Sequence, residues 1–384
     1  MNILIITPVG DYRGGAERSL LETVKILLES GHKLIVVTSN TGDFTDEIKN
    51  LGVKIVTTGV KDEYIVIGKK NFFPALFLAV YTNFRLFYLI KKNSIDLIYI
   101  HTSGIFPWVF ITIFLLNLNH IIVQERSGKP NVLIRWLYRF LGKRLIVIFN
   151  SKFMKDTYHT VFVKVPWKED YVLYPPIDLE TFAPKSEEEK LRIRSQLELK
   201  VTDFLIVYVG RICRSKQIHH IIEAIDFIPE PERIHIAIVG KASNKDEVAY
   251  EKFLLEEIHR RKRGKNVHFL GFRKDTALIM SSADLLVLPS NEEPFGRAII
   301  EAQACGTPVI AADSGGAIEA IDYELGLTFE TGNIKDLAEK ISKILDYKKS
   351  FSKREYVERV RKHLLNKAGI SQYRKNLLLI INQI

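Results

Sequence analysis

Short runs of aliphatic and β-branched residues alternate along the whole chain with longer segments in which apolar residues recur every three or four positions. The runs are typical of buried parallel strands, and the segments are typical of amphipathic helices. The predicted strands are Ile3–Thr7, Leu34–Thr38, Val53–Thr57, Leu97–Ile100, Ile121–Val123, Leu145–Phe149, Phe204–Val209, Ile234–Val239, Val267–Leu270, Leu285–Leu288 and Pro308–Ala311. The predicted helices include Ala16–Ser30, Pro74–Lys92, Val132–Leu141, Ser215–Ile228, Val248–Lys262, Thr276–Ser282, Gly296–Ala304 and Lys367–Ile381. Such alternation predicts two doubly wound parallel sheets.

A proline-rich break separates the two halves of this pattern. Tyr174-Pro175-Pro176-Ile177-Asp178 favours an extended segment, because adjacent prolines interrupt regular structure. A charged stretch at 186–200 follows it. At 384 residues the chain is long enough for two domains, and this break is where we expect them to meet.

Composition indicates a folded protein with an uneven positive charge. The chain has 47% hydrophobic and 26% charged residues and a net charge of +10, and residues 1–170 carry 22 Lys and Arg against 14 Asp and Glu. No long basic cluster is interleaved with aromatic residues, so we do not expect nucleic acid as a partner. Attraction to an anionic membrane or a lipid pyrophosphate is one interpretation of this charge, and an ordinary solvated surface is the other.

Two apolar stretches bear on membrane attachment. Ile105–Val123 is long enough to span a bilayer but contains a proline, two asparagines and a histidine, and Phe72–Ile90 is interrupted by Pro74, Asn83 and Arg85. We predict that both form buried elements of an α/β layer, although an aromatic face in 72–88 could lie at a membrane interface. A strand directly after Met1 and only two cysteines lead us to expect a cytoplasmic protein, with contact at the inner face of the membrane as an open possibility.

One strand–loop–helix segment carries the most specific chemistry. The loop Asn291–Gly296 lies between the run Leu285–Leu288 and a predicted helix. Open α/β sheets bind ligands at the carboxyl ends of their strands, and a helix start offers N–H groups to an anion. Glu293 precedes the helix and Glu301 lies in its second turn, so two carboxylates could meet different parts of one extended ligand. A nucleotide-sugar has the required anionic middle and hydroxylated ends, and solvated surface acids are the alternative.

Two other loops offer groups for a diphosphate. Gly14 and Gly15 follow the first strand and open the first helix, where a backbone can approach a ligand closely. Arg211 and Lys216 follow the first strand of the second half, and a guanidinium fork with an ammonium point charge can neutralise a diphosphate. An ordinary turn and a solvated helix start are the alternative interpretations.

Polar residues also follow three strands of the first half. His101 ends one strand and could hydrogen-bond a transferred sugar or move a proton, although a packed or surface histidine is the common case. Glu125 and Arg126 follow the next strand, and Ser151 follows the one after. We expect these three to line a cleft.

The spacing Glu293-x7-Glu301 closely resembles the signature of retaining glycosyltransferases of the GT-B fold, in particular glycosyltransferase family 4. Other elements resemble that family in the same order along the chain: Gly-Gly-Ala-Glu from Gly14, the Tyr-Pro-Pro-Ile-Asp linker with Phe182 beyond it, Gly210-Arg211 and Ser314-Gly315-Gly316. One position departs from the family, because Gln217 stands where a glycine often follows the lysine.

The resemblance implies an α/β GT-B fold, with two doubly wound parallel-sheet (Rossmann-like) domains facing a central cleft. Residues 1–173 would form the acceptor-binding domain and residues 174–366 the nucleotide-sugar domain, and a terminal helix at about 367–384 would return to the first domain. Glu293 and His101 would act at the transferred sugar. Donor contacts would come from Arg211, Lys216, Glu301, Phe295, Gly296 and Gly15. The acceptor side of the cleft would include Gly14, Glu125, Arg126 and Ser151.

The resemblance further implies retaining transfer of a hexose from GDP-mannose or a UDP-hexose to a sugar or a lipid-linked glycan. The nucleoside-diphosphate sugar would be a co-substrate, and we expect no cofactor. No Asp-x-Asp motif and no His/Cys cluster with zinc spacing occurs, so the sequence requires no metal. A GT-B nucleotide-sugar epimerase and a non-catalytic sugar-nucleotide-binding subunit are the alternatives.

Overall fold

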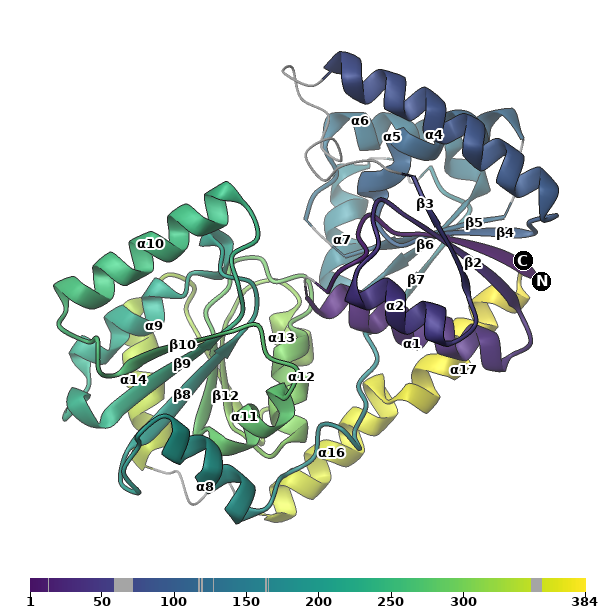
Figure 1. The fold of residues 1–384 in the computed structure, drawn as a ribbon. Coiled ribbons are helices and arrows are strands. Elements are labelled where there is room, and N and C mark those ends of the chain that lie inside the picture. Colours follow the sequence, from purple (N-terminus) through teal and green to yellow (C-terminus); the bar gives the residue numbers. More distant parts are fainter. Residues whose placement is uncertain are drawn as a thin grey trace. The chain divides into compact units, whose positions relative to one another are not determined.

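The structure is a computed structural model, which describes residues 1–12, 14–58, 72–116, 118, 120–126, 128–162, 164, 166–346 and 354–384. The chain divides into two compact units. Unit 1 comprises Met1–Tyr174 and Tyr373–Ile384, and unit 2 comprises Pro175–Gln372. Each unit is a parallel sheet with helices on both faces (Figure 1).

The described residues of unit 1 form a seven-stranded sheet of order β3-β2-β1-β4-β5-β6-β7. Its strands are β1 (Asn2–Ile6), β2 (Lys33–Thr38), β3 (Lys54–Thr57), β4 (Leu97–Ile100), β5 (Ile121–Glu125), β6 (Leu145–Phe149) and β7 (Glu169–Val172). Its helices are α1 (Gly15–Glu29), α2 (Asp43–Asn50), α4 (Phe72–Lys92), α5 (Phe106–Leu115), α6 (Val132–Leu141) and α7 (Lys152–Val161). All pairings are parallel, with Ile3 opposite Leu34 on one side and Leu97 on the other.

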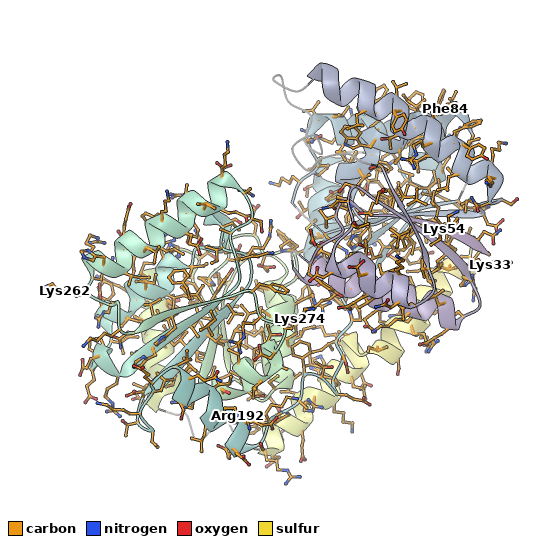
Figure 2. All side chains as sticks on the ribbon, viewed as in Figure 1. Lys33, Lys54, Phe84, Arg192, Lys262 and Lys274 are labelled. Atoms are coloured by element: carbon orange, nitrogen blue, oxygen red, sulfur yellow. The ribbon has the colours of Figure 1, made fainter. Side chains whose placement is uncertain are left out.

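Right-handed crossovers place α1 and α2 on one face of this sheet and α4 to α7 on the other. Helix α4 buries Leu86 and Ile90 but turns other apolar side chains outward, among them Phe84, which is 74% exposed (Figure 2). The predicted burial of the helix over 72–90 holds for one side of α4, the side that meets the sheet. Across the described residues, no helix is both long and apolar enough to cross a membrane.

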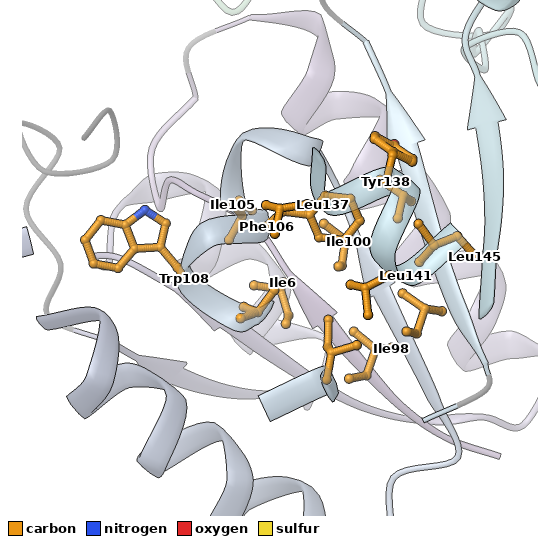
Figure 3. Packing of buried hydrophobic residues seen from close by; sticks show 14 of the residues in the cluster. Ile6, Ile98, Ile100, Ile105, Phe106, Trp108, Leu137, Tyr138, Leu141 and Leu145 are labelled. Atoms are coloured by element: carbon orange, nitrogen blue, oxygen red, sulfur yellow. The ribbon is translucent and has the colours of Figure 1, made fainter. Parts of the chain in front are cut away.

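The core between the sheet and α4 to α7 is built from large apolar side chains. Alternate strand residues such as Ile98 and Ile100 belong to one buried cluster with Phe106 of α5 and Tyr138 of α6 (Figure 3). The rings of Phe106 and Tyr138 pack edge to face at 5.3 Å between centroids. This packing fixes the carboxyl ends of β4 and β5, where predicted site residues lie.

The C-terminal helix α17 (Ile370–Asn382) completes unit 1. Tyr373 is buried, and its hydroxyl lies 2.8 Å from Thr23 Oγ1 on α1. Arg374 forms an ion pair with Glu29 at 2.7 Å. The helix α16 (Arg354–Ala368) precedes it and belongs to unit 2, so the single predicted helix over 367–381 is mostly α17, and the chain changes helix at Gly369.

The described residues of unit 2 form a six-stranded parallel sheet of order β10-β9-β8-β11-β12-β13. Its strands are β8 (Phe204–Val209), β9 (Ile234–Val239), β10 (Val267–Gly271), β11 (Leu285–Leu288), β12 (Val309–Ala312) and β13 (Gly326–Phe329). Its helices are α8 (Glu187–Gln196), α9 (His219–Ala224), α10 (Lys245–Arg260), α11 (Thr276–Ser282), α12 (Arg297–Ala304), α13 (Ala317–Ala320), α14 (Ile334–Asp346) and α16. The strand order reverses between β8 and β11, which is where open α/β sheets bind ligands.

Candidate functional site

Two charged loops meet at this reversal point of unit 2. Strands β8 and β11 are neighbours, and the Asn291 N–H after β11 donates to the Ser215 carbonyl after β8 at 3.1 Å. Lys216 Nζ then donates to the Glu293 carboxylate. The two side chains are only 17% and 11% exposed. The structure thus joins the predicted phosphate cation and the predicted catalytic carboxylate in one largely buried ion pair.

The turn that carries Lys216 explains the departure at Gln217. Arg214–Lys216 form a single 3₁₀ turn, and Gln217 after it has φ 48° and ψ 38°. This left-handed conformation costs a non-glycine residue about 1–2 kcal/mol, whereas glycine adopts it freely. Gln217 therefore keeps the backbone path that a glycine would give. The helix predicted near 215–228 begins later than predicted, because this turn delays the start of α9 until His219, and a 3₁₀ helix continues it over Ile225–Phe227.

A glycine pair holds the loop of Glu293 in place. The Gly316 N–H donates to the Glu293 carbonyl at 2.6 Å. A Cβ atom on Gly315 would lie 2.4 Å from the Glu293 carbonyl oxygen, and one on Gly316 would lie 2.2 Å from the Pro294 carbonyl oxygen. Only glycine fits such close backbone contacts, so the Ser-Gly-Gly segment positions Glu293.

Helix α12 presents the second carboxylate. Gly296 precedes it at φ 89°, a conformation that favours glycine, and the helix begins at Arg297. Glu301 Oε1 accepts hydrogen bonds from Arg297 at 3.0 Å (Nη2) and 3.2 Å (Nε). The ring of Phe295 is 2% exposed, so it anchors the loop in the core. The donor contact predicted for Phe295 therefore cannot come from its buried ring.

Arg211 is the most exposed of the predicted donor residues. Its side chain is 53% exposed, and its Nη1 lies 3.5 Å from Glu247 Oε1. The Ser243 N–H donates to Glu247 at 2.7 Å and fixes that carboxylate. An anionic ligand can reach the guanidinium from solvent. Arg211 and Lys216 both lie beyond the carboxyl end of β8, in agreement with the sequence prediction.

His101 occupies the corresponding edge of unit 1, just after β4. Its N–H donates to the Ile6 carbonyl at 3.0 Å, and its Nδ1 lies 3.3 Å from Thr7 Oγ1. The imidazole is 2% exposed, and its Nε2 has no hydrogen-bond partner among the described residues. Burial, aided by the positive charge of Arg126, holds the pKa of His101 well below its ordinary value, so the ring is neutral.

The start of α1 lies beside this histidine. Ala16 contributes a backbone interaction that partly offsets the lowered pKa of His101. The Gly14 N–H donates to the Glu17 carboxylate at 2.9 Å. Apart from its chain neighbours, no atom of the described residues lies within 4 Å of the position of a Cβ on Gly14, so these residues leave open space beside the helix start. Gly15 begins α1, as predicted to within one residue.

Glu125 and Ser151 do not line an open surface, contrary to the sequence prediction. Strand β5 continues through Glu125, which pairs with Phe149 of β6 and is completely buried. Its carboxylate accepts hydrogen bonds from Ser103 at 2.9 Å and from Tyr138. Ser151 is also completely buried and caps α7 by accepting the Met154 N–H at 3.1 Å.

Burial decides the charge of Glu125. Removal from water raises the pKa of this carboxyl to about 7, although hydrogen bonds from Tyr138, Ser103 and Tyr158 act in the opposite direction. Arg126 is half-buried, and its Nη2 donates to Gln124 at 2.6 Å. Unit 1 therefore holds a protonatable acid. Its hydrogen-bond partners lie 13 to 33 residues away along the chain, and the sequence does not identify them.

A pocket opens next to Thr7 at the carboxyl ends of β1 and β2. It is mostly apolar and is lined by Ile6, Thr7, Pro8, Val37, Thr38, Ser39, Thr58, Thr82, Leu86, Ile105, Trp108 and Val109. The buried hydroxyls of Thr38 and Thr82 have no hydrogen-bond partner among the described residues. The described side chains of the two units include no group of three His, Cys, Asp or Glu residues that could hold a metal ion.

Two parallel-sheet Rossmann-like units, the second with paired ions at the reversal of its strand order, define a protein of the GT-B glycosyltransferase class. Residues 13–181 match the model of Glycosyltransferase Family 4, and residues 189–363 match that of Glycosyl transferases group 1. Together these matches cover most of the chain, which belongs to this family of glycosyltransferases. The predicted family and fold class are confirmed.

Solved structures agree with this fold over the full length. The Anabaena protein HepE in complex with UDP-glucose superposes with a TM-score of 0.84 at 21% identity, covering 100% of both chains. The sucrose-phosphate synthase of Thermosynechococcus elongatus superposes with a TM-score of 0.81 at 19% identity, covering 100% of this chain and 98% of its own.

Relatives by sequence include an uncharacterized glycosyltransferase of Methanocaldococcus jannaschii, 31% identical over 215 residues, which are 55% of this chain and 53% of that protein. The D-inositol 3-phosphate glycosyltransferase of Mycobacteroides abscessus is 32% identical over 53% of this chain and 44% of its own. The chain thus spans about half the length of these relatives. An N,N'-diacetylbacillosaminyl-diphospho-undecaprenol alpha-1,3-N-acetylgalactosaminyltransferase of Campylobacter jejuni is 25% identical over 85% of both chains.

Proposed function

We propose that this protein transfers a hexose from a nucleoside-diphosphate sugar to a sugar or lipid-linked glycan acceptor. The observation that carries the proposal is the Lys216–Glu293 ion pair, which two adjacent strand ends bring together. In such a ligand the diphosphate and the sugar are adjacent. A cation that binds the diphosphate and a carboxylate that acts at the sugar must therefore lie side by side in the protein. The family of the chain supports the same activity.

Unit 2 would hold the donor. Lys216 and Arg211 would neutralise the diphosphate, together with the N–H groups at the start of α12. Glu301, oriented by Arg297, would accept hydrogen bonds from the ribose hydroxyls. These positive groups would stabilise the departing nucleoside diphosphate without a bound metal.

Glu293 would act at the transferred sugar. The close backbone contacts of Gly315 and Gly316 fix its backbone, and the ion pair with Lys216 fixes its carboxylate. A preorganised negative charge there would stabilise an oxocarbenium-like transition state. We propose that transfer retains the anomeric configuration, with attack on the same face assisted by the leaving phosphate. His101, neutral and with an unpartnered Nε2, would hydrogen-bond a sugar hydroxyl.

Unit 1 would receive the acceptor near the start of α1. The open space beside Gly14 supports this assignment, as does the half-buried Arg126. The Campylobacter relative acts, by its name, on a diphospho-undecaprenol, which supports a lipid-linked acceptor here. We place the protein in the cytoplasm with peripheral contact at the inner face of an anionic membrane, a location supported by the basic first half of the chain. The donor would be GDP-mannose or a UDP-hexose.

A thermal-shift panel of GDP-mannose, UDP-glucose, UDP-galactose and UDP-N-acetylhexosamines tests the donor assignment. A ligand at 100 times its Kd adds about 2.7 kcal/mol to the stability of the folded state, so one sugar nucleotide should raise the Tm by several degrees. Glu301→Ala should reduce that shift, and Glu256→Ala, an exposed change on α10, should leave it intact. No shift with any member would contradict the proposal.

Product analysis with the identified donor separates transfer from the alternatives. Transfer requires an added acceptor, whereas an epimerase would release a changed sugar without one. A binding subunit would shift the Tm and form no product.

A further inference from the structure

The outer surface of three helices in unit 1 gathers most of the exposed aromatic side chains. Among the described residues, ten aromatic side chains are exposed, and seven of them lie on α4, α5 and α6. We call this surface the α4–α6 face, and its exposed apolar residues are Val80, Tyr81, Phe84, Phe87, Tyr88, Ile111, Phe114, Leu115, Val132, Leu133, Trp136 and Phe140. Figure 2 shows Phe84 on α4 as part of it.

The rings of this face pack on one another at the surface. Trp136 and Phe140 of α6 stack at 5.4 Å between centroids, and Phe114 of α5 lies 5.3 Å from Phe140. Hydrogen bonds from Thr112 of α5 to Asn83 of α4, at 2.8 Å from the backbone N–H, join α5 to α4. The three helices therefore form one layer, and large contiguous apolar patches of this kind mark interaction surfaces.

The charge around this face is almost entirely positive. Residues 72–151 contain nine Lys and Arg but only two acids, Asp96 and Glu125. Glu125 is buried, and Asp96 accepts the Asn2 N–H at 2.7 Å near the amino ends of the strands. Arg139 and Lys143 are exposed on and just after α6. An apolar surface bordered by cations complements an anionic lipid bilayer, whereas two copies of the face would repel each other.

We propose that the α4–α6 face is a docking surface for an anionic lipid bilayer, with Trp136, Phe140 and Phe114 inserted at the boundary between headgroups and acyl chains. Interfacial helices bury their apolar face about 5–10 Å into this boundary, and tryptophan favours it because its ring is apolar and its N–H is polar. The basic residues would contact the headgroups. The face belongs to unit 1 and includes none of the residues proposed for donor binding. The proposal specifies the surface for the membrane contact proposed above, and it can fail independently of glycosyl transfer.

Tryptophan fluorescence tests the docking directly, because the three tryptophans differ in exposure. Trp136 is 53% exposed, whereas Trp108 and Trp167 are 4% and 6% exposed. Vesicles of phosphatidylglycerol and phosphatidylcholine should shift the emission to the blue, and brominated lipid should quench it. Trp136→Phe should remove both effects while the protein still sediments with the vesicles. Vesicles of phosphatidylcholine alone should bind it much more weakly.

Surface variants identify the groups responsible. Arg139→Gln with Lys143→Gln should weaken vesicle binding about thirtyfold, since each surface cation contributes about fivefold. Phe114→Ser with Phe140→Ser should abolish the blue shift of Trp136. The matched controls are Phe227→Ser with Phe272→Ser and Lys265→Gln with Lys274→Gln, all exposed in unit 2, and they should bind as the wild type does.

Three outcomes would overturn the proposal. The first is a wild-type protein that does not sediment with anionic vesicles, and the second is a set of face variants that bind as tightly as the controls. The third is self-association of the wild type that Phe114→Ser with Phe140→Ser removes, without any vesicle binding, which would assign the face to a second copy. The vesicles contain no donor or acceptor, so none of these results bears on the glycosyl-transfer proposal.

Discussion

The polar residues that follow the strands differ in charge and burial between the two units. In unit 2 the candidate site is made of ionic pairs, Lys216 with Glu293 and Arg297 with Glu301, at the edge of the sheet. In unit 1, His101 and Glu125 at the carboxyl ends of the strands are buried, and burial lowers the pKa of His101 and raises that of Glu125 to about 7. Both units have the same kind of sheet, so the difference lies in the loops beyond the strands.

This difference indicates which kind of ligand group the loops of each unit can bind. An ion pair such as Lys216 with Glu293 places a cation and a carboxylate side by side, which suits a ligand that carries both phosphates and hydroxyl groups. The neutral imidazole of His101 offers a hydrogen bond without a net charge, which suits a sugar hydroxyl, whereas Glu125 is completely buried. The same fold thus supplies a charged site and an uncharged one from similar strand ends.

The largest expected effect tests the charged side of the comparison. Glu293→Gln removes the negative charge that we place at the transition state but keeps the side-chain volume. Turnover should fall about 100- to 1,000-fold, the range for losing one preorganised electrostatic contact, while the Kd of the donor changes little. Initial rates and calorimetry measure both quantities. Glu292→Gln, an exposed neighbour, is the control, and equal turnover in the two variants would remove Glu293 from the reaction.

The next effect tests the neutral side, through the pH dependence of stability. The pKa of Glu125 rises from an ordinary value of 4.5 to about 7 on folding, so between these pH values the native state holds a proton that the unfolded state has lost. The free energy of unfolding should therefore fall as pH rises through this window, by on the order of 3 kcal/mol, and level off above it. Glu125→Gln should flatten this decline.

Denaturation followed by tryptophan fluorescence measures this change, because Trp108, Trp136 and Trp167 all lie in unit 1. Glu29→Gln is the control, since its exposed ion pair with Arg374 contributes little. A wild type and a Glu125→Gln variant with parallel pH profiles would show that Glu125 is not a buried, protonated acid.

A smaller effect sharpens the view of the second ionic pair. Glu301→Ala should weaken donor binding about 10- to 100-fold, as expected when a hydrogen bond to a charged group is lost, and should lower turnover at saturating donor much less than Glu293→Gln does. Calorimetric titration with the donor measures the Kd. If Glu301→Ala bound donor as tightly as Glu256→Ala does, the ribose contact would be wrong.

The smallest expected effect is a flat profile. The imidazole of His101 stays neutral because burial and Arg126 hold its pKa well below 6.5. Its charge should therefore add no step to the pH–rate profile of the wild type between pH 6 and 8. A step near pH 6.5 that disappears in His101→Gln would show that this histidine titrates, and the contrast between the units would be lost.

The sequence pattern predicts the central strands and the edge strands β3 and β10, but it misses the edge strands β7 and β13. Phe204–Val209 and Leu145–Phe149 are continuous apolar runs because helices cover both faces of these strands, and both predictions are confirmed. Strand β7 (Glu169–Val172) is missed because an edge strand keeps polar residues, here Asp170, which pairs with Lys155 of α7. Helices α2 and α7 and strand β13 are missed as well.

The positions of the candidate site residues can be predicted where a residue and its strand are close in sequence, whereas their roles stay predictions. Glu293, Glu301 and Lys216 follow strand ends as predicted, and the i,i+4 spacing of Arg297 and Glu301 could have revealed their pairing. The partner of Arg211, Glu247, lies 36 residues away, and no local pattern points to it.

From its sequence alone, the chain could be assigned two doubly wound sheets and the residues that follow each strand, because these depend on local periodicity and on the small set of allowed crossovers. Only the tertiary structure decided which of those residues are charged, paired or enclosed. Glu125 and Glu293 both come at a strand's end, yet one is sealed beneath Tyr138 and the other meets Lys216. Burial depends on neighbours brought from distant parts of the chain, and these neighbours set the pKa and the chemistry of each group.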